Sequence, residues 1–134
     1  IVPADKADEY ATVDACKSLK FAVEAGSAGK EMAEANGFTF TEVIDQATAL
    51  LEVASGTSDA AIIDSLMAGA MVGDGTGYSE LTYTVGLNSE KYGVGFRKGS
   101  ELAEKFNAFF DESVKNGEAE KIAETYGVQA ALIK

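Results

Sequence analysis

Two short segments of the chain carry residue types that together suit a small zwitterionic ligand. Residues 24–29 (EAGSAG) follow an apolar stretch and combine small residues with the hydroxyl of Ser27, which is typical of a turn leading into a helix. The N–H groups at the start of a helix attract anions. Asp64 ends a second apolar run. If the two runs are neighbouring parallel strands, an anion site and a carboxylate face one cleft, which a free amino acid fits.

Each of these residues also has a purely structural interpretation. Gly26 can make a tight turn while Ser27 only caps the following helix, and Asp64 can cap the helix after it. Glu24 either contacts the side chain of a ligand or lies in solvent at the end of its strand. Asp59, at the opposite end of the second run, is expected to form a turn. The first segment is neither a P-loop nor a GxGxxG fingerprint, because it lacks the residues that define them.

The composition argues against several classes of function. The 134 residues are enough for a domain with its own core, and 22 acidic against 11 basic residues give a net charge of −11. That charge argues against binding nucleic acid or an anionic membrane surface. The chain has no histidine, and its single cysteine, Cys16, is expected to be a small buried apolar residue. We therefore expect no metal, no cofactor and, because no nucleophile is paired with a base, no catalytic site.

Strands and helices alternate in the predicted secondary structure. Apolar patterns predict strands over residues 1–3, 20–25, 38–43, 60–63, 81–85 and 92–96. Helical spacing and capping residues predict helices over about 13–19, 28–35, 45–55 and 64–72, then two more separated by Asn116-Gly117. This order predicts an α/β fold with a mostly parallel sheet and flanking helices, followed by a C-terminal helical extension.

Three segments carry motifs in a recognisable order: KFAVEAGSAG at residues 20–29, ATALLEVASGTSDAAIID at 47–64 and YGVGFRKGS at 92–100. They resemble, in family order, segments of the polar amino-acid solute-binding proteins of ABC importers, which have the periplasmic-binding-protein-like fold of type 2. The first matches the family's V-x-x-G-[ST]-[TS] motif except at Ala28. The resemblance covers nearly the whole chain, and three ordered segments are far more specific than one.

The resemblance implies a domain organisation. Members of the family have two lobes joined by two crossover strands, and the ligand is clamped between the lobes. By resemblance, residues 1–98 form the second lobe with both crossover strands, 1–5 and 92–97. Residues 99–134 are then C-terminal helices that belong to a first lobe otherwise absent from this chain.

The resemblance also implies a function and site residues. The chain is expected to be an extracytoplasmic amino-acid-binding domain, periplasmic or from a cell-surface lipoprotein, that serves an ABC permease through the full-length protein. No signal segment is present in this chain. Ser27 and Ala28 would face the ligand carboxylate, Asp64 its ammonium group and Glu24 its side chain. Ala28 lacks the hydroxyl of the usual Ser or Thr and Gly29 lacks a side chain. Both departures are expected to enlarge the pocket or weaken the grip on the carboxylate.

Two other functions stay open at this point. Some relatives of these receptors are dehydratases that act on prephenate-like acids, although no acid or cation in this sequence is marked for such a role. The chain can also be an interaction fragment that binds no small molecule, which the departure at Ala28 favours.

A stripe of apolar residues on the first C-terminal helix needs a cover. Its members recur at helical spacing, and left exposed they would form a sticky patch: Leu102, Phe106, Phe109, Phe110 and Val114. We expect the chain to bury them by pairing with a second copy, by exchanging its C-terminal helices or by packing them on its own sheet.

Overall fold

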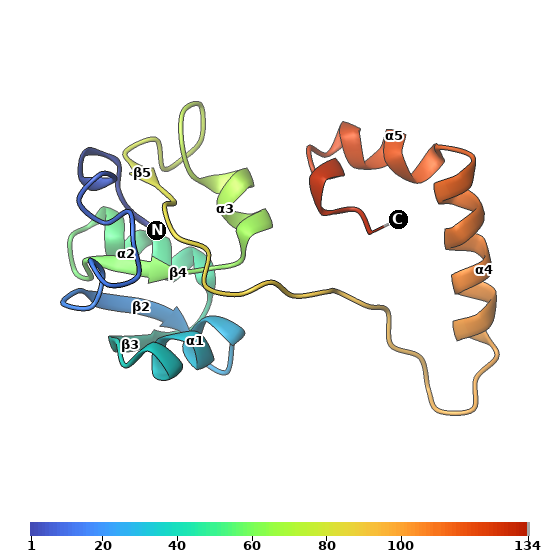
Figure 1. The fold of residues 1–134 in the computed structure, drawn as a ribbon, viewed down its shortest axis with the longest axis horizontal. Coiled ribbons are helices and arrows are strands. Elements are labelled where there is room, and N and C mark those ends of the chain that lie inside the picture. The colour runs from blue at the N-terminus through green and yellow to red at the C-terminus, as the bar shows by residue number, and fades with distance from the viewer. Residues whose placement is uncertain (134) are drawn as a thin grey trace. The chain divides into compact units, whose positions relative to one another are not determined.

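The computed structural model describes residues 1–133 and divides into two compact units, residues 1–89 and the chain from residue 90 onward (Figure 1). Lys134, with which the predicted second segment ends, lies outside the described residues. All strands of the described chain lie in the first unit, and the second unit is helical. The predicted α/β fold with a C-terminal helical extension is confirmed.

A three-stranded parallel sheet in the order β3-β2-β4 forms the centre of the first unit. β2 (Lys20–Glu24) lies between β3 (Thr39–Val43) and β4 (Ala60–Ile62), and it runs parallel to both. The two apolar runs that precede the candidate site residues are therefore neighbouring parallel strands, as predicted.

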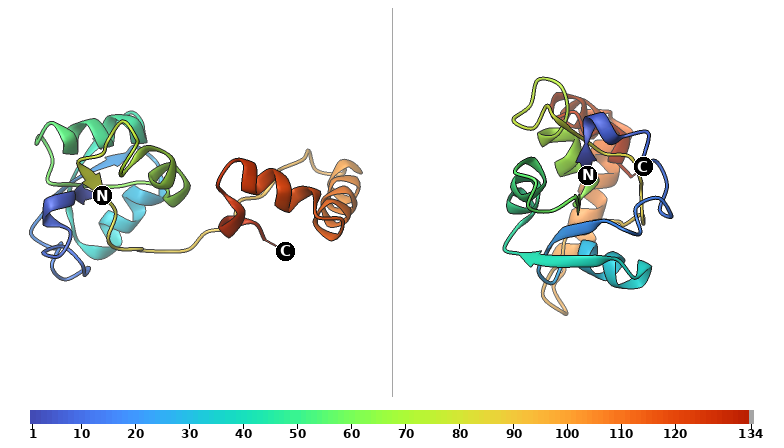
Figure 2. Two further views of the ribbon diagram at one scale, coloured as in Figure 1. Left: turned by 90° about the horizontal axis from the view of Figure 1, so that it is seen from above. Right: turned by 90° about the vertical axis from the view of Figure 1, so that its left-hand side faces the viewer.

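The two faces of this sheet are covered by different helices (Figures 1 and 2). Phe21 and Val23 of β2 belong to the core under α1 (Ala28–Asn36), whereas Ala22 belongs to the core under α2 (Gln46–Ala54). All three side chains are buried. Since successive side chains of a strand point to opposite faces, β2 contributes to the core on both sides of the sheet.

The helix boundaries follow the local signals in the sequence. Ser27, Asp45 and Asp64 cap the N-termini of α1, α2 and α3 (Ser65–Met71) with side-chain oxygens. α1 ends at Gly37, whose φ of 69° is in the left-handed region that favours glycine.

The start of the chain forms a second, two-stranded sheet. β1 (Val2–Pro3) pairs antiparallel with β5 (Leu81–Thr82), and a short 3-10 helix, η1 (Ala4–Lys6), follows β1. The carbonyl of Ile1 accepts a hydrogen bond from the N–H of Ala61 at 2.9 Å, so the chain start lies beside β4. The predicted first strand is confirmed, whereas the strand predicted over 81–85 ends after Thr82.

Two other predicted elements are wrong. Residues 13–19 form turns rather than a helix, although the Thr12 hydroxyl still accepts a hydrogen bond from the N–H of Ala15. A helix of two turns is marginal in isolation, and here Cys16 and Leu19 are buried without it. Residues 92–97, predicted as the second crossover strand, form no strand in the structure. Two glycines weaken this segment, and it pairs with no other strand among the described residues.

The second unit is built from two helices that pack against each other. α4 (Leu102–Lys115) and α5 (Glu118–Thr125) are separated at Gly117, which has a φ of 81°, and a 3-10 helix, η2 (Gln129–Ala131), follows. The break at Asn116-Gly117 is as predicted. No helix of the described chain has the length and apolar character that a membrane span needs.

Candidate ligand site at the carboxyl edge of the sheet

Three helices begin at one edge of the parallel sheet. β2, β3 and β4 each lead through a short turn into a capped helix, and their caps are Ser27, Asp45 and Asp64 respectively. Because the strands are parallel, their carboxyl ends and these helix N-termini lie at the same edge. This edge, called the carboxyl edge below, carries all four residues that we singled out from the sequence.

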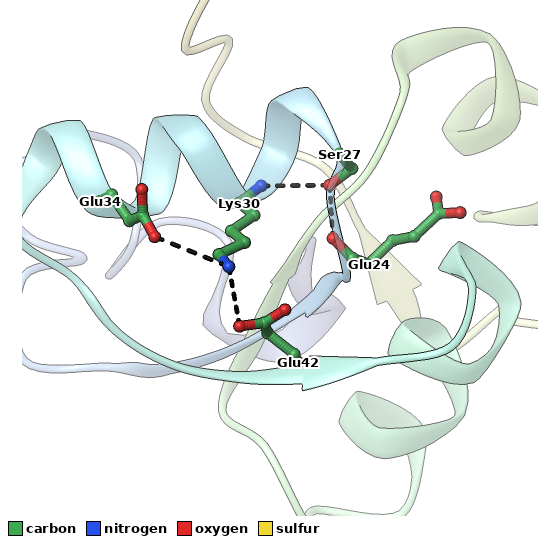
Figure 3. Close-up of polar contacts among 5 residues, drawn as sticks. All are labelled: Glu24, Ser27, Lys30, Glu34 and Glu42. Carbon is green, nitrogen blue, oxygen red and sulfur yellow. Dashed lines mark hydrogen bonds and ion pairs between the residues drawn. The ribbon is translucent and has the colours of Figure 1, made fainter.

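Ser27 closes the turn between β2 and α1. Its Oγ accepts a hydrogen bond from the N–H of Lys30 at 3.1 Å and donates one to the carbonyl of Glu24 at 2.7 Å (Figure 3). The capping role weighed for Ser27 is therefore confirmed. Within residues 1–133 the N–H groups of Ala28 and Gly29 donate to no protein acceptor, which leaves two donors at the start of α1.

Gly29 brings α1 close to the end of β4. A Cβ atom added to Gly29 would lie 3.0 Å from the carbonyl oxygen of Ile62 and 3.2 Å from its Cγ2 atom. The expectation that Gly29 enlarges a pocket is therefore wrong, because Ile62 already fills that space. Glycine is needed here so that the first turn of α1 can lie against β4.

Asp64 is the cap of α3. Its Oδ1 accepts hydrogen bonds from the N–H groups of Leu66 at 2.8 Å and Met67 at 3.2 Å. Its own N–H donates to Oε1 of Gln46, the first residue of α2, at 2.8 Å. This link between the starts of α2 and α3 has no signal in the sequence, because the two residues are 18 positions apart.

The two remaining acidic residues that we discussed lie at opposite ends of the sheet. Glu24 is the last residue of β2 and is partly exposed, and Figure 3 shows its side chain pointing away from Lys30 and Glu42. Asp59 lies at the amino end of β4, where its Oδ2 accepts a hydrogen bond from the N–H of Lys20 at 2.9 Å. Its predicted structural role away from the carboxyl edge is thereby confirmed.

The helix caps at the carboxyl edge differ in charge. Asp45 Oδ1 accepts hydrogen bonds from both the N–H and the hydroxyl of Thr48, each at 2.7 Å, and these bonds hold the pKa of Asp45 below its usual value. Asp64 likewise presents a carboxylate to α3. Only α1, of these three helices, begins at the neutral side chain of Ser27. An incoming anion therefore meets no carboxylate cap at α1.

An ion pair that we did not predict lies beside the start of α1. The Nζ of Lys30 is 2.9 Å from Oε1 of Glu42 on β3 and 3.9 Å from Oε1 of Glu34 on α1 (Figure 3). The hydrogen bond to Glu42 is the largest cause of a raised pKa for Lys30. The spacing of Lys30 and Glu34 is a readable i,i+4 signal, whereas the contact with Glu42 depends on strand register.

The described residues offer no metal site. No three Cys, Asp or Glu side chains within 1–133 are arranged to hold an ion. Cys16 is buried, and that burial raises the pKa of its thiol, so it behaves as the small apolar residue we expected.

Solved structures are similar to this chain over most of its length, although no protein-family model and no curated protein matches it. A mutant of ArgBP from T. maritima superposes with a TM-score of 0.77 and 27% sequence identity, covering 93% of this chain and 55% of its own. AncCDT-1, an ancestral amino acid-binding protein and a precursor of cyclohexadienyl dehydratase, gives a TM-score of 0.74 and 26% identity, covering 93% of this chain and 54% of its own.

The chain thus spans about half the length of the proteins that it resembles. The likeness includes the sheet and the helices that begin at its carboxyl edge, since it extends over nearly the whole chain. By fold and by this likeness, the chain is a periplasmic-binding-protein-like domain similar to amino-acid-binding proteins.

Proposed function

We propose that the chain is the amino-acid-binding domain of an ABC importer's substrate-binding protein. The observation that carries the proposal is the parallel pairing of β2 and β4, which brings the starts of α1 and α3 to one edge. An amino acid has one anionic and one cationic group, and this edge offers a partner for each. The likeness to an ancestral amino acid-binding protein supports the same ligand class.

The ligand carboxylate binds at the start of α1 in this proposal. The N–H groups of Ala28 and Gly29 are donors without protein acceptors among residues 1–133, and the cap, Ser27, is neutral. A helix N-terminus of this kind stabilises an anion through its N–H groups and its dipole. Ala28 provides only its main chain. Ala28→Ser should therefore tighten binding by about two- to tenfold, the usual worth of one added hydrogen bond.

The ligand ammonium group binds at Asp64, and Glu24 faces the ligand side chain. Asp64 caps α3 with Oδ1, and a capping carboxylate keeps its negative charge at the same edge. Glu24 ends the strand that leads to Ser27 and directs its side chain away from the Lys30–Glu42 ion pair (Figure 3).

We propose a binding role rather than a catalytic one. Both compared proteins are named as binding proteins, although one is also a precursor of a dehydratase. The alternative, a dehydratase-like enzyme on this scaffold, is tested by incubating the chain with prephenate or arogenate. Turnover that Asp64→Asn abolishes would establish the enzyme, and no turnover is the expected result.

The location and the importer partner belong to the same proposal. A substrate-binding protein of this type works outside the cytoplasm, in the periplasm or at the cell surface, and passes its ligand to an ABC permease. The full-length protein would make that contact. Co-purification of the full-length protein with a permease encoded beside it checks this part.

The C-terminal helices are proposed to pair two copies of the chain or to be exchanged between them. In the single chain Leu102 and Phe109 are 56% and 64% exposed, and Phe106 and Phe110 are partly exposed. Burying such side chains stabilises an assembly by about 1.5–3 kcal/mol each. Light scattering at several protein concentrations tests the proposal, and a strict monomer would contradict it.

Isothermal titration with a panel of amino acids tests the binding proposal. Because the chain spans about half the length of the compared proteins, we expect weak binding. Asp64→Asn keeps an oxygen that can cap α3 but removes the charge, and should weaken binding at least about tenfold. Asp45→Asn makes the same change at the cap of α2 and should change affinity less than about twofold. Silence of the unaltered chain across the panel would favour the interaction fragment instead.

A further inference from the structure

The only basic residue between positions 21 and 90 lies beside the proposed site. That range includes all three helix caps of the carboxyl edge, and its single cation is Lys30. Lys30 belongs to the first turn of α1, and its N–H donates to Oγ of Ser27 at 3.1 Å. Its ammonium group is therefore carried by the same turn that is proposed to bind the ligand carboxylate.

The side chain of Lys30 is nevertheless held against β3. Its Nζ is 2.9 Å from Oε1 of Glu42, and Glu34 is a second, more distant partner at 3.9 Å. Glu42 lies opposite Val23 in the register of β3 and β2, close to the carboxyl ends of both strands. Figure 3 shows the Lys30 side chain reaching towards Glu42 while Glu24 points the other way.

The pair is placed to resist solvent better than an ordinary surface pair. The Lys30 side chain is 29% exposed and that of Glu42 is 43% exposed, whereas the Lys105–Glu101 pair of α4 is 70% and 83% exposed. A less exposed pair is less screened by water and salt. The partnership between Lys30 and Glu42 is thus the firmer of the two, and it keeps the ammonium group at β3.

We propose that Glu42 determines ligand specificity: by holding the Lys30 ammonium at β3, it keeps that charge from the ligand and so favours amino acids with a cationic side chain over those with an acidic one. This inference rests on the proposed function. With Lys30 engaged, the charges left for a ligand side chain are the carboxylates of Glu24 and Asp64. A cationic side chain complements them, and a second ligand carboxylate is repelled by them.

Removing Glu42 should release the lysine and shift the preference. A unit charge gained within a Debye length of a ligand changes affinity by about two- to thirtyfold, depending on the local dielectric. In Glu42→Gln the Lys30 ammonium is free to reach a ligand anion near the start of α1. We therefore expect binding of L-glutamate to strengthen and binding of L-lysine to weaken.

The experiment measures dissociation constants of L-lysine and L-glutamate by isothermal titration at low salt. The readout is the ratio of the glutamate constant to the lysine constant, which should exceed one in the unaltered chain. Glu42→Gln should lower this ratio at least about threefold. Glu34→Gln, which removes the same charge from the more distant partner of Lys30, should lower it by less than half of that amount on a logarithmic scale.

Two further variants isolate the lysine. Lys30→Met combined with Glu42→Gln should restore the ratio of the unaltered chain, because no free cation is left. Lys30→Met alone should not lower the ratio, and it keeps the test decisive if Glu42→Gln fails to fold. An equal effect of Glu42→Gln and Glu34→Gln, or a double variant that behaves like Glu42→Gln, would overturn the inference but leave the proposed function intact. If the unaltered chain binds neutral amino acids only, the inference falls alone. If it binds no amino acid, both fall.

Discussion

The two compact units of this chain differ most in how much of their apolar surface they bury. In the first unit Val23, Leu50 and Leu81 are fully buried, and helices cover both faces of the sheet. In the second unit the buried residues within the described chain are Ser113 and Ala123. Its apolar side chains include several that are more than half exposed: Tyr92, Val94, Leu102, Phe109, Ile122, Tyr126 and Ile133.

This difference separates the part that folds around its own core from the part that presents an apolar face. The first unit has a sheet whose central strand is buried on both sides, and its helix caps are fixed by hydrogen bonds. The second unit has amphipathic helices whose stripe was readable in the sequence. A stripe predicts that a helix has an apolar face, but it does not predict which surface covers that face.

The largest contrast is expected from truncating one large apolar side chain in each unit. Leu50→Ala opens a cavity at a fully buried position of α2 and should cost about 2–5 kcal/mol of unfolding free energy. Phe109→Ala, at a position that is 64% exposed, should cost less than about 0.5 kcal/mol. Urea unfolding followed by circular dichroism measures both. A cost for Phe109→Ala that approaches that of Leu50→Ala and grows with protein concentration would show that another copy covers the stripe.

The second contrast compares two glycines of the first unit. Gly29→Ala places a Cβ atom 3.0 Å from the carbonyl oxygen of Ile62 and should cost about 1–3 kcal/mol, because α1 must move away from β4. Gly69→Ala, inside α3 with no atom within 4 Å of the added Cβ, should stabilise the unit by about 0.5–1 kcal/mol. Thermal unfolding measures the difference. Equal effects of the two substitutions would mean that α1 does not lie tightly on β4.

A third contrast uses the two buried serines, one from each unit. The hydroxyl of Ser58 donates to Oε2 of Glu52 at 2.6 Å, so Ser58→Ala should cost about 1–2 kcal/mol by leaving that carboxylate without a donor. Ser113 lies inside α4, where alanine is the better helix former, so Ser113→Ala should be neutral or stabilising by up to about 0.5 kcal/mol. A destabilising Ser113→Ala, measured by urea unfolding, would reveal a polar partner for the second unit.

The smallest contrast concerns pH and the helix starts. Asp45 caps α2, and hydrogen bonds from Thr48 hold its pKa below the usual 3.8, whereas α4 begins at Glu101 without a side-chain cap. A carboxyl group with a lowered folded-state pKa stabilises the fold above pH 3.8, and this contribution is lost as the pH falls through the folded-state pKa. Asp45→Asn should therefore flatten the acid branch of the stability profile, and Glu101→Gln should not. An unchanged acid branch in Asp45→Asn would remove Asp45 from this account.

Much of the first unit was predictable because its signals are local. Ser27 and Asp64 stand directly before helices, and each follows a buried strand, so the strand-helix order placed both at one edge of a parallel sheet. The segment 92–97 misled us because its alternating aromatic and apolar residues fit a strand, whereas a strand also requires a partner to pair with.

The parts of the site that sequence reasoning missed depend on contacts between distant residues. The Lys30–Glu42 ion pair follows from the register of β3 against β2 and from the placement of α1. The tight packing of Gly29 on Ile62 depends on how closely a helix approaches a strand, which no local pattern encodes. The hydrogen bond from Asp64 to Gln46 likewise needs the starts of α2 and α3 to be neighbours.

The most direct test of the central claim is a titration of the isotope-labelled chain with L-lysine and then L-glutamine, followed residue by residue in amide NMR spectra. If the carboxyl edge binds the amino acid, the amide signals of Ala28 and Gly29 should shift together with those of Leu66 and Met67, and the signals of α4 and α5 should stay in place. Shifts confined to α4 and α5, or no shift of Ala28 and Gly29 at saturating ligand, would contradict an amino-acid site at this edge.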